Sequence, residues 1–259
     1  MPDIFIGHGS PMNALSDNIY TQAWAAFGAS VPRPQAILAI SAHWLTRGTA
    51  VTAMARPRTI HEFNDFPQRL LDIQYPAAGS IELAHRVQTL LTPIDVTLDQ
   101  DWGLDYGSWA VLCKVFPLAD IAVVQLSIDA TQAPAYHFML GQKLAALRDQ
   151  GVVIIASGNV VHNLGLLVSR EGAPAFDWAS RFNQVVRSGV LNQDFESLVN
   201  FDKHGEDARL SIPTTDHYLP LLYILGAVQD DDAVSIPIDG IENSSISMLS
   251  VLVNQAASL

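Results

Sequence analysis

Cysteine is almost absent from this chain of 259 residues, which contains only Cys113. A single thiol cannot form an intrachain disulfide or a cysteine-rich metal site, so any metal bound here must use other ligands. Cys113 falls in the apolar stretch WAVLCKVF, where we expect a small core side chain.

Basic residues are also scarce, with 14 Lys and Arg against 26 Asp and Glu and a formal net charge of −12. Binding of nucleic-acid phosphates requires a basic face, so this composition argues against a nucleic-acid partner. Only 15% of the residues are charged and 49% are hydrophobic. Such a chain can bury a sizeable core and does not have the composition of a disordered protein.

Long apolar runs are missing as well. The segment YLPLLYILGAV, residues 218–228, is far shorter than the roughly 20 residues that a membrane span requires. The opening segment MPDIFIGHGS has neither the basic n-region nor the long apolar h-region of a signal peptide. We therefore expect a cytoplasmic protein with no membrane partner, whose oligomeric state the sequence leaves open.

The pattern of apolar residues predicts an α/β fold. Continuous apolar runs occupy residues 4–7, 36–41, 121–128 and 152–158. Runs without polar alternation are typical of strands that are buried on both faces. Helices are predicted at residues 80–92, 135–151 and 177–191, and further strands at 233–240 and 246–253. With no repeat or linker in evidence, we expect one domain over residues 1–259, with a mostly parallel central sheet flanked by helices on both faces.

Three of the eight histidines share one local context. His8, His43 and His162 each lie a few residues beyond the C-terminal end of a predicted buried strand. In open α/β sheets, ligands bind at that edge because the loops converge there. One histidine at a strand end is more often structural, hydrogen-bonded to a nearby carbonyl, but three in the same context indicate a shared site.

His217, in the segment IPTTDHYLPLLYILGA, is a fourth candidate. Asp216 is predicted to cap a helix in which His217 takes the first position and Pro220 the fourth. The positive potential at a helix start disfavours protonated histidine, and neutral imidazole is the form that binds metals. The alternative is that His217 is only a surface residue of the first helical turn.

A cluster of four histidines without cysteine favours zinc, iron or copper over calcium or magnesium. Three ligands with open coordination positions would form a catalytic site, whereas four closed ones would form a structural site. His61 lies in the loop TIHEFNDFP beside Phe63 and Phe66. That loop is either a lid over an apolar pocket or a segment anchored by its two aromatic residues.

Five motifs in order carry a family resemblance: GHGSPM, SAHW, WGLDYGSW, SGNVVHN and DHYLPLLYILGA. Together they resemble the class III, LigB-type extradiol ring-cleavage dioxygenases, in particular the 4,5-DOPA dioxygenase branch. The resemblance extends from about Ile4 to Val253 and so covers nearly the whole chain. It implies an α/β enzyme that opens a DOPA-like catechol with O₂ and releases a ring-opened semialdehyde.

The resemblance also implies a mononuclear non-heme metal held by His8, His43 and His217. His162 would be the acid/base catalyst, or would fill a fourth coordination position in a resting form. Fe(II) would support turnover, with Zn(II) as another ion that the site would accept. Asp216 is adjacent to His217, but neighbouring helix residues point about 100° apart, so only one of them is expected to reach the metal.

Two positions depart from the family pattern. Tyr106 stands in a DYG segment where the family usually has histidine in DHG, and Asp65 stands where relatives commonly have glycine. Tyrosine donates a hydrogen bond but does not take up a proton near neutral pH. Tyr106, His61 and Trp44 are the residues predicted to form the substrate-pocket wall.

Two other functions remain open from the sequence. The same scaffold with zinc and a bound hydroxide would suit a zinc-dependent hydrolase. A non-enzymatic interaction protein of the Memo type, which shares the LigB-like fold, is the second. That second function predicts a large exposed apolar patch and an imperfect metal site.

Overall fold

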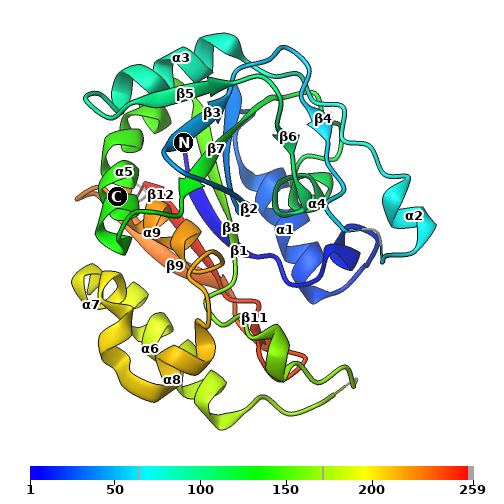
Figure 1. The fold of residues 1–259 in the computed structure, drawn as a ribbon, viewed down its shortest axis with the longest axis vertical. Coiled ribbons are helices and arrows are strands. Elements are labelled where there is room, and N and C mark those ends of the chain that lie inside the picture. The colour runs from blue at the N-terminus through cyan, green and yellow to red at the C-terminus, as the bar shows by residue number, and fades with distance from the viewer. Residues whose placement is uncertain (64, 171, 256–259) are drawn as a thin grey trace.

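The computed structural model describes residues 1–63, 65–170 and 172–255. Its centre is an eight-stranded sheet with the order β5-β3-β7-β2-β8-β1-β12-β9 (Figure 1). The strands are β1 Asp3–Gly7, β2 Ala36–Thr46, β3 Thr49–Thr52, β5 Val96–Asp99, β7 Ala122–Asp129, β8 Val152–Gly158, β9 Asp232–Ile238 and β12 Ser250–Gln255. The four apolar runs of the sequence therefore correspond to β1, β2, β7 and β8.

The middle of the sheet is parallel, as predicted. Strand β2 pairs in parallel with β7 and β8, and β8 pairs in parallel with β1. The edges differ, because β12 runs antiparallel to β1, β9 antiparallel to β12, and β3 antiparallel to β7. Parallel neighbours place the carboxyl ends of β1, β2 and β8 at one edge of the sheet. His8 and His162 follow β1 and β8 as predicted, whereas His43 lies within β2, which continues to Thr46 beyond the predicted end at residue 41.

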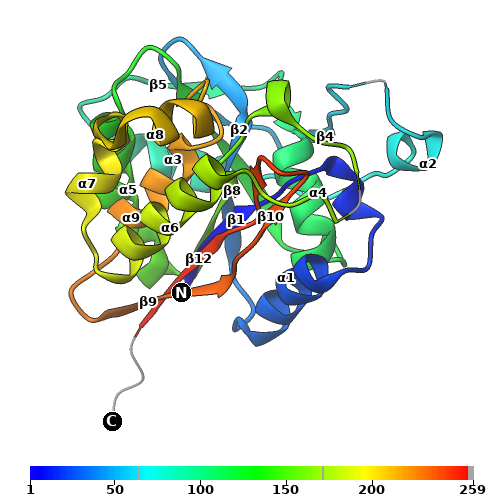
Figure 2. The same ribbon diagram turned by 90° about the horizontal axis from the view of Figure 1, so that it is seen from below.

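Helices cover both faces of the sheet (Figures 1 and 2). Those on one face are α1 Ile19–Ser30 and α4 Tyr106–Val115, and those on the other are α3 Ile81–Leu90, α5 Pro134–Leu144, α6 Asp177–Leu191 and α9 Leu219–Gly226. Adjacent strand residues alternate between the two cores: Ile4 and Ile6 pack with the α1 and α4 side, whereas Phe5 packs with α5 and α9. Burial on both faces explains why the strands are apolar without alternation.

Short elements complete the described chain. They are β4 Arg58–Thr59, β6 Gly103–Leu104, β10 Ile241–Glu242, β11 Ile246–Ser247, α2 Gln68–Leu71, α7 Phe195–Val199 and α8 Gly205–Ser211, together with 3-10 helices at Pro11–Ala14, Ala145–Gln150, Leu164–Leu166 and Phe201–His204. No helix in the described residues is long and apolar enough to span a membrane.

Two sequence predictions need correction. The predicted strand at 246–253 is divided into β11 and β12, because β11 pairs with β10 in a separate hairpin. The helix expected from Asp216 begins only at Leu219, so His217 lies in the turn before it and Pro220 is at the second helical position. Asp216 bonds to the imidazole of His217 and does not cap the helix.

Candidate metal centre

Three histidines from separate parts of the chain meet at the carboxyl edge of the sheet. His8 follows β1, His43 lies in the irregular last part of β2, and His217 lies in the turn before α9. Their ring centroids are 5.3 to 5.5 Å apart, and one nitrogen from each lies within 4.8 Å of the others. This grouping makes the three imidazoles candidate ligands of a single metal ion.

Close backbone packing brings the turn of His217 to this edge. A Cβ atom added at Gly158, the last residue of β8, would lie 2.2 Å from the carbonyl oxygen of His217. The same carbonyl accepts a hydrogen bond of 2.8 Å from the Asn159 amide, and the His8 amide donates to the Gly158 carbonyl over 3.0 Å. Gly158 is therefore the point at which two of the three histidines are held together.

Each of the three rings is held by an oxygen atom at its Nδ1. His8 Nδ1 is 2.6 Å from Ser157 Oγ, His43 Nδ1 is 3.2 Å from Glu62 Oε1, and His217 Nδ1 is bonded to Asp216 Oδ2. The two carboxylates accept a hydrogen bond from Nδ1–H, so the proton stays on Nδ1 and the Nε2 lone pair is free to bind a metal. This chain's own residues therefore fit a bound divalent transition metal by their donor chemistry as well as by their position.

Burial controls the protonation of these imidazoles. Desolvation, reinforced by the neighbouring histidines, lowers the pKa of His8 well below its usual value. Desolvation also lowers the pKa of His217, although Asp216 opposes the shift. For His43 the desolvation is outweighed by Glu62 and two more distant carboxylates, and its pKa is raised. Two of the three rings are thus neutral at physiological pH, the form that binds metals.

His162 lies against this group and is not one of the three. Its ring is stacked on that of His217 with the centroids 3.5 Å apart and the planes 8° from parallel. Desolvation and the neighbouring His217 lower the pKa of His162 to about 3. A neutral imidazole beside a candidate metal position is a proton acceptor that the three ligands leave available.

The four histidines open onto a cavity of about 500 Å³. Its apolar wall is made of Phe63, Phe66, Leu164, Leu167 and Ile246. Its other polar side chains are Ser10, Asp65, Ser169, Glu242 and Asn243. A volume of this size accommodates a substituted aromatic ring.

The three residues predicted for the pocket wall occupy different environments. Tyr106 is at the first position of α4 and 2% exposed, and its hydroxyl donates to the Phe63 carbonyl over 3.3 Å. It lines a narrow crevice beside His8 and His43 but does not line the large cavity.

The other two residues of that prediction pack against aromatic side chains. His61, from the same loop as Phe63, packs its ring 5.7 Å from that of Tyr106. Trp44 is 3% exposed and stacks on Trp102 with the ring centroids 5.5 Å apart. Neither His61 nor Trp44 is among the residues that line the large cavity. The residues that do line it come from the 63–66 loop, the segment after β8 and the β10–β11 hairpin.

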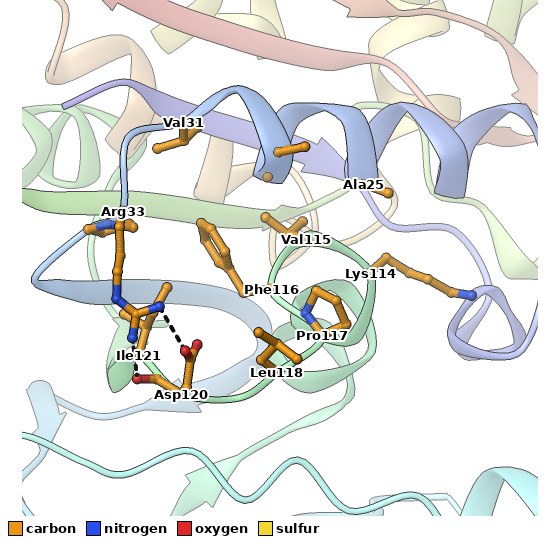
Figure 3. A pocket seen from close by; sticks show the side chains of 13 residues that line it. Ala25, Val31, Arg33, Lys114, Val115, Phe116, Pro117, Leu118, Asp120 and Ile121 are labelled. Carbon is orange, nitrogen blue, oxygen red and sulfur yellow. Dashed lines mark hydrogen bonds and ion pairs between the residues drawn. The ribbon is translucent and has the colours of Figure 1, made fainter.

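A second cavity, of about 350 Å³, lies at the opposite edge of the sheet, between the end of α1 and the loop from α4 to β7 (Figure 3). Its lining includes Val31, Val115 and Leu118, and Arg33 Nη1 forms an ion pair of 2.7 Å with Asp120 Oδ2 at its rim. It contains no histidine among the described residues. The candidate metal ligands therefore lie at the other edge of the sheet.

This architecture, an α/β sheet with three converging histidines and an adjacent cavity, defines a metal-dependent enzyme class. The model of the family described as the catalytic LigB subunit of aromatic ring-opening dioxygenase matches residues 5–254. The chain belongs to this family, whose members are metal-dependent. It is accordingly an extradiol aromatic ring-opening dioxygenase, a class that acts on catechols with O₂.

Relatives agree with this assignment. An Escherichia coli K12 protein named 4,5-DOPA dioxygenase extradiol is 54% identical over 97% of this chain and 94% of its own length. A Beta vulgaris protein of the same name is 35% identical over 90% of this chain and 88% of its own. A solved structure of an uncharacterized E. coli K12 protein superimposes with a TM-score of 0.87 at 49% identity, over 98% of this chain and all of that one. These names support neither the zinc hydrolase nor the interaction protein that the sequence left open.

Proposed function

We propose that this chain, acting as one catalytic domain, opens the ring of a DOPA-like catechol beside its two hydroxyl groups. His8, His43 and His217 would hold a mononuclear Fe(II), and Zn(II) would bind the same ligands without supporting turnover. The observation that carries this proposal is that all three imidazoles are anchored through Nδ1 while one ring nitrogen from each lies within 4.8 Å of the others.

The metal, when bound, acidifies the catechol hydroxyls and supplies the redox contact with O₂. The net reaction is balanced: both atoms of one O₂ are incorporated, a ring carbon–carbon bond is cleaved, and the semialdehyde contains every atom of the two reactants. The protein's part is to bind the ring between apolar walls, to orient it and to move protons.

His162 is the proposed acid/base. Its ring lines the cavity, and burial lowers its pKa, so the imidazole is unprotonated before the substrate binds. It accepts a phenolic proton as the catechol binds and returns that proton when the ring opens. The stacking on His217 holds it beside the metal ligands without making it one of them.

The proposal is tested by loading the protein with Fe(II) under anaerobic conditions, then adding air and a panel of catechols. We expect one O₂ consumed per catechol and a yellow ring-opened product. Zn(II)-loaded protein is the control and should consume no O₂. Absence of O₂ uptake with every catechol, in protein shown to contain iron, would contradict the function.

The role of His162 is tested by replacing it with phenylalanine. We expect ring opening to fall by at least 10²-fold, the usual scale of a lost general base. The stoichiometry of metal binding should stay at one ion per chain, because the three ligands are unchanged. Ring opening at the normal rate in His162→Phe would show that another group carries the proton.

A further inference from the structure

The lysine, arginine, aspartate and glutamate side chains of a cavity wall set its charge, and in this cavity they are all acidic. The described residues that line it include two acids, Glu242 and Asp65, and no lysine or arginine. Asp65 is exposed, whereas Glu242 is half-buried. A site for a catechol with an anionic side chain would be expected to present a basic residue, and this wall presents the opposite charge.

Glu242 is held in a fixed position by a tight hairpin. It ends β10, and its carbonyl accepts a hydrogen bond of 3.2 Å from the Ser245 amide across Asn243 and Ser244. Both central residues have positive φ, 49° and 67°, as type I′ turns require. Ser245 Oγ in turn donates to the Asn163 carbonyl over 2.8 Å, which ties the hairpin to the segment that carries His162.

Backbone pairing aligns Glu242 with the proposed acid/base. Ile246 of β11 is paired with Glu242 of β10 on one side and with His162 on the other. Directly paired residues project their side chains to the same face, and here all three line the cavity. Two strand spacings put the backbone of Glu242 about 10 Å from that of His162. A catechol ring with a two-carbon side chain reaches across a comparable length.

The carboxylate of Glu242 has no hydrogen-bond or ion-pair partner among the residues that the structure describes. Burial without such a partner raises the pKa of Glu242 above its ordinary value. A half-buried carboxylate that faces a cavity is stabilised when a cationic ligand pairs with it, because the ion pair compensates for the solvation free energy that burial removes.

We propose that Glu242 recognises the ammonium group of the substrate, and that the enzyme's substrates are catechols carrying a positively charged amine on a short side chain. This inference rests on the proposed function. It ranks substrates by charge: a cationic catecholamine first, a zwitterionic amino acid such as DOPA next, and an anionic catechol acid last. Glu242 is a specificity residue here and takes no part in the chemical step.

The test uses four catechols that differ mainly in side-chain charge: dopamine, DOPA, 3-(3,4-dihydroxyphenyl)propionate and the neutral 4-methylcatechol. Values of kcat/KM are measured with iron-loaded enzyme, and dissociation constants with zinc-loaded protein by calorimetry. The variants are Glu242→Gln, Glu242→Lys and, as a matched control, Glu82→Gln on the exposed surface of α3.

We expect Glu242→Gln to lower kcat/KM and affinity for dopamine by about tenfold or more, and to leave 4-methylcatechol within about twofold. Glu242→Lys should reverse the order of dopamine and the propionate, and Glu82→Gln should change nothing. An equal effect of Glu242→Gln on all four compounds, or a wild-type preference for the propionate, overturns the inference. Charge-selective binding to zinc-loaded protein without ring opening of any catechol supports amine recognition and contradicts the dioxygenase function.

Discussion

At the scale of single residues, the site depends on oxygen atoms that anchor the imidazoles. The histidines were predictable because each of three lies shortly after a continuous apolar run, a pattern that local sequence reveals. Ser157 and Glu62 were not predictable as their partners, because 149 and 19 residues of chain separate them from His8 and His43. Only the folded sheet brings these pairs together. For Asp216 the sequence predicts a helix cap, whereas in the structure its carboxylate bonds to His217 Nδ1.

Asp216 gives the sharpest residue-scale prediction. Replacing it with asparagine keeps an acceptor for His217 Nδ1 but removes the negative charge, so the affinity for Zn(II) should fall by about tenfold. Competition with a chromophoric chelator measures this directly. Glu82→Gln, remote from the site, is the control and should bind Zn(II) as the wild type does. Unchanged affinity in Asp216→Asn would mean that the carboxylate does not support the ligand.

At the scale of elements, the strands β1, β2, β7 and β8 and the helices α3, α5 and α6 were predictable because burial imposes a clear pattern on each. Helix α3, for example, begins after the predicted cap Ser80. Helices α1 and α4 were missed because they are apolar on several sides: α4 buries eight of its ten residues, so no polar face marks it. The start of α9 was misplaced because proline is equally compatible with the second helical position.

Replacement of Gly158 tests the contact between two elements, because this residue lets the end of β8 pack closely against the turn that carries His217. Alanine there would place a Cβ 2.2 Å from a backbone oxygen, which forces the turn away from the strand. We expect Gly158→Ala to lose about 1 to 3 kcal/mol of unfolding free energy and to bind metal more weakly. Urea unfolding and Zn(II) titration measure the two effects. Gly165→Ala, where the nearest atom is 3.4 Å away, should be near neutral, and equal behaviour of the two variants would refute the packing argument.

At the scale of the whole molecule, a buried charge cluster connects the first strand, β1, with the edge strand β9. Arg148 lies 3.3 Å from Asp3 of β1 and is bidentate on Asp232 of β9. Desolvation raises the pKa of Asp3 to about 7 despite Arg148. The contribution of Asp3 to the free energy of unfolding is therefore largest below its ordinary pKa and is lost as the pH rises towards 7. A buried histidine with a lowered pKa has the opposite effect, because its contribution to the free energy of unfolding is lost as the pH falls. None of this long-range pairing is visible in local sequence, since it depends on how β1 and β9 are placed in the sheet.

The contribution of His137 to the pH dependence of the free energy of unfolding can be measured separately. It is fully buried against the Tyr223 hydroxyl, and desolvation lowers its pKa to about 4. The unfolded chain, with a pKa near 6.5, binds the proton more readily. Titration of His137 therefore leaves the free energy of unfolding unchanged above about pH 6.5 and lowers it by about 3 kcal/mol as the pH drops towards 4.

Urea unfolding of the wild type and of His137→Gln from pH 4 to 8 isolates this contribution as the difference between the two curves. The curves should converge as the pH falls, because the variant lacks the group that must be protonated on unfolding. His85→Gln, at an exposed position of α3, serves as the control and should run parallel to the wild type. Parallel curves for His137→Gln as well would contradict the assignment.

The central claim is that one metal ion is shared by three imidazoles anchored through Nδ1. Anomalous diffraction at the iron edge, from crystals loaded anaerobically with Fe(II), tests it most directly. The expected result is a single peak about 2.1 Å from the Nε2 atoms of His8, His43 and His217, with the His162 ring beside it. A peak elsewhere in the molecule, or one bound by fewer than these three rings, would contradict the account.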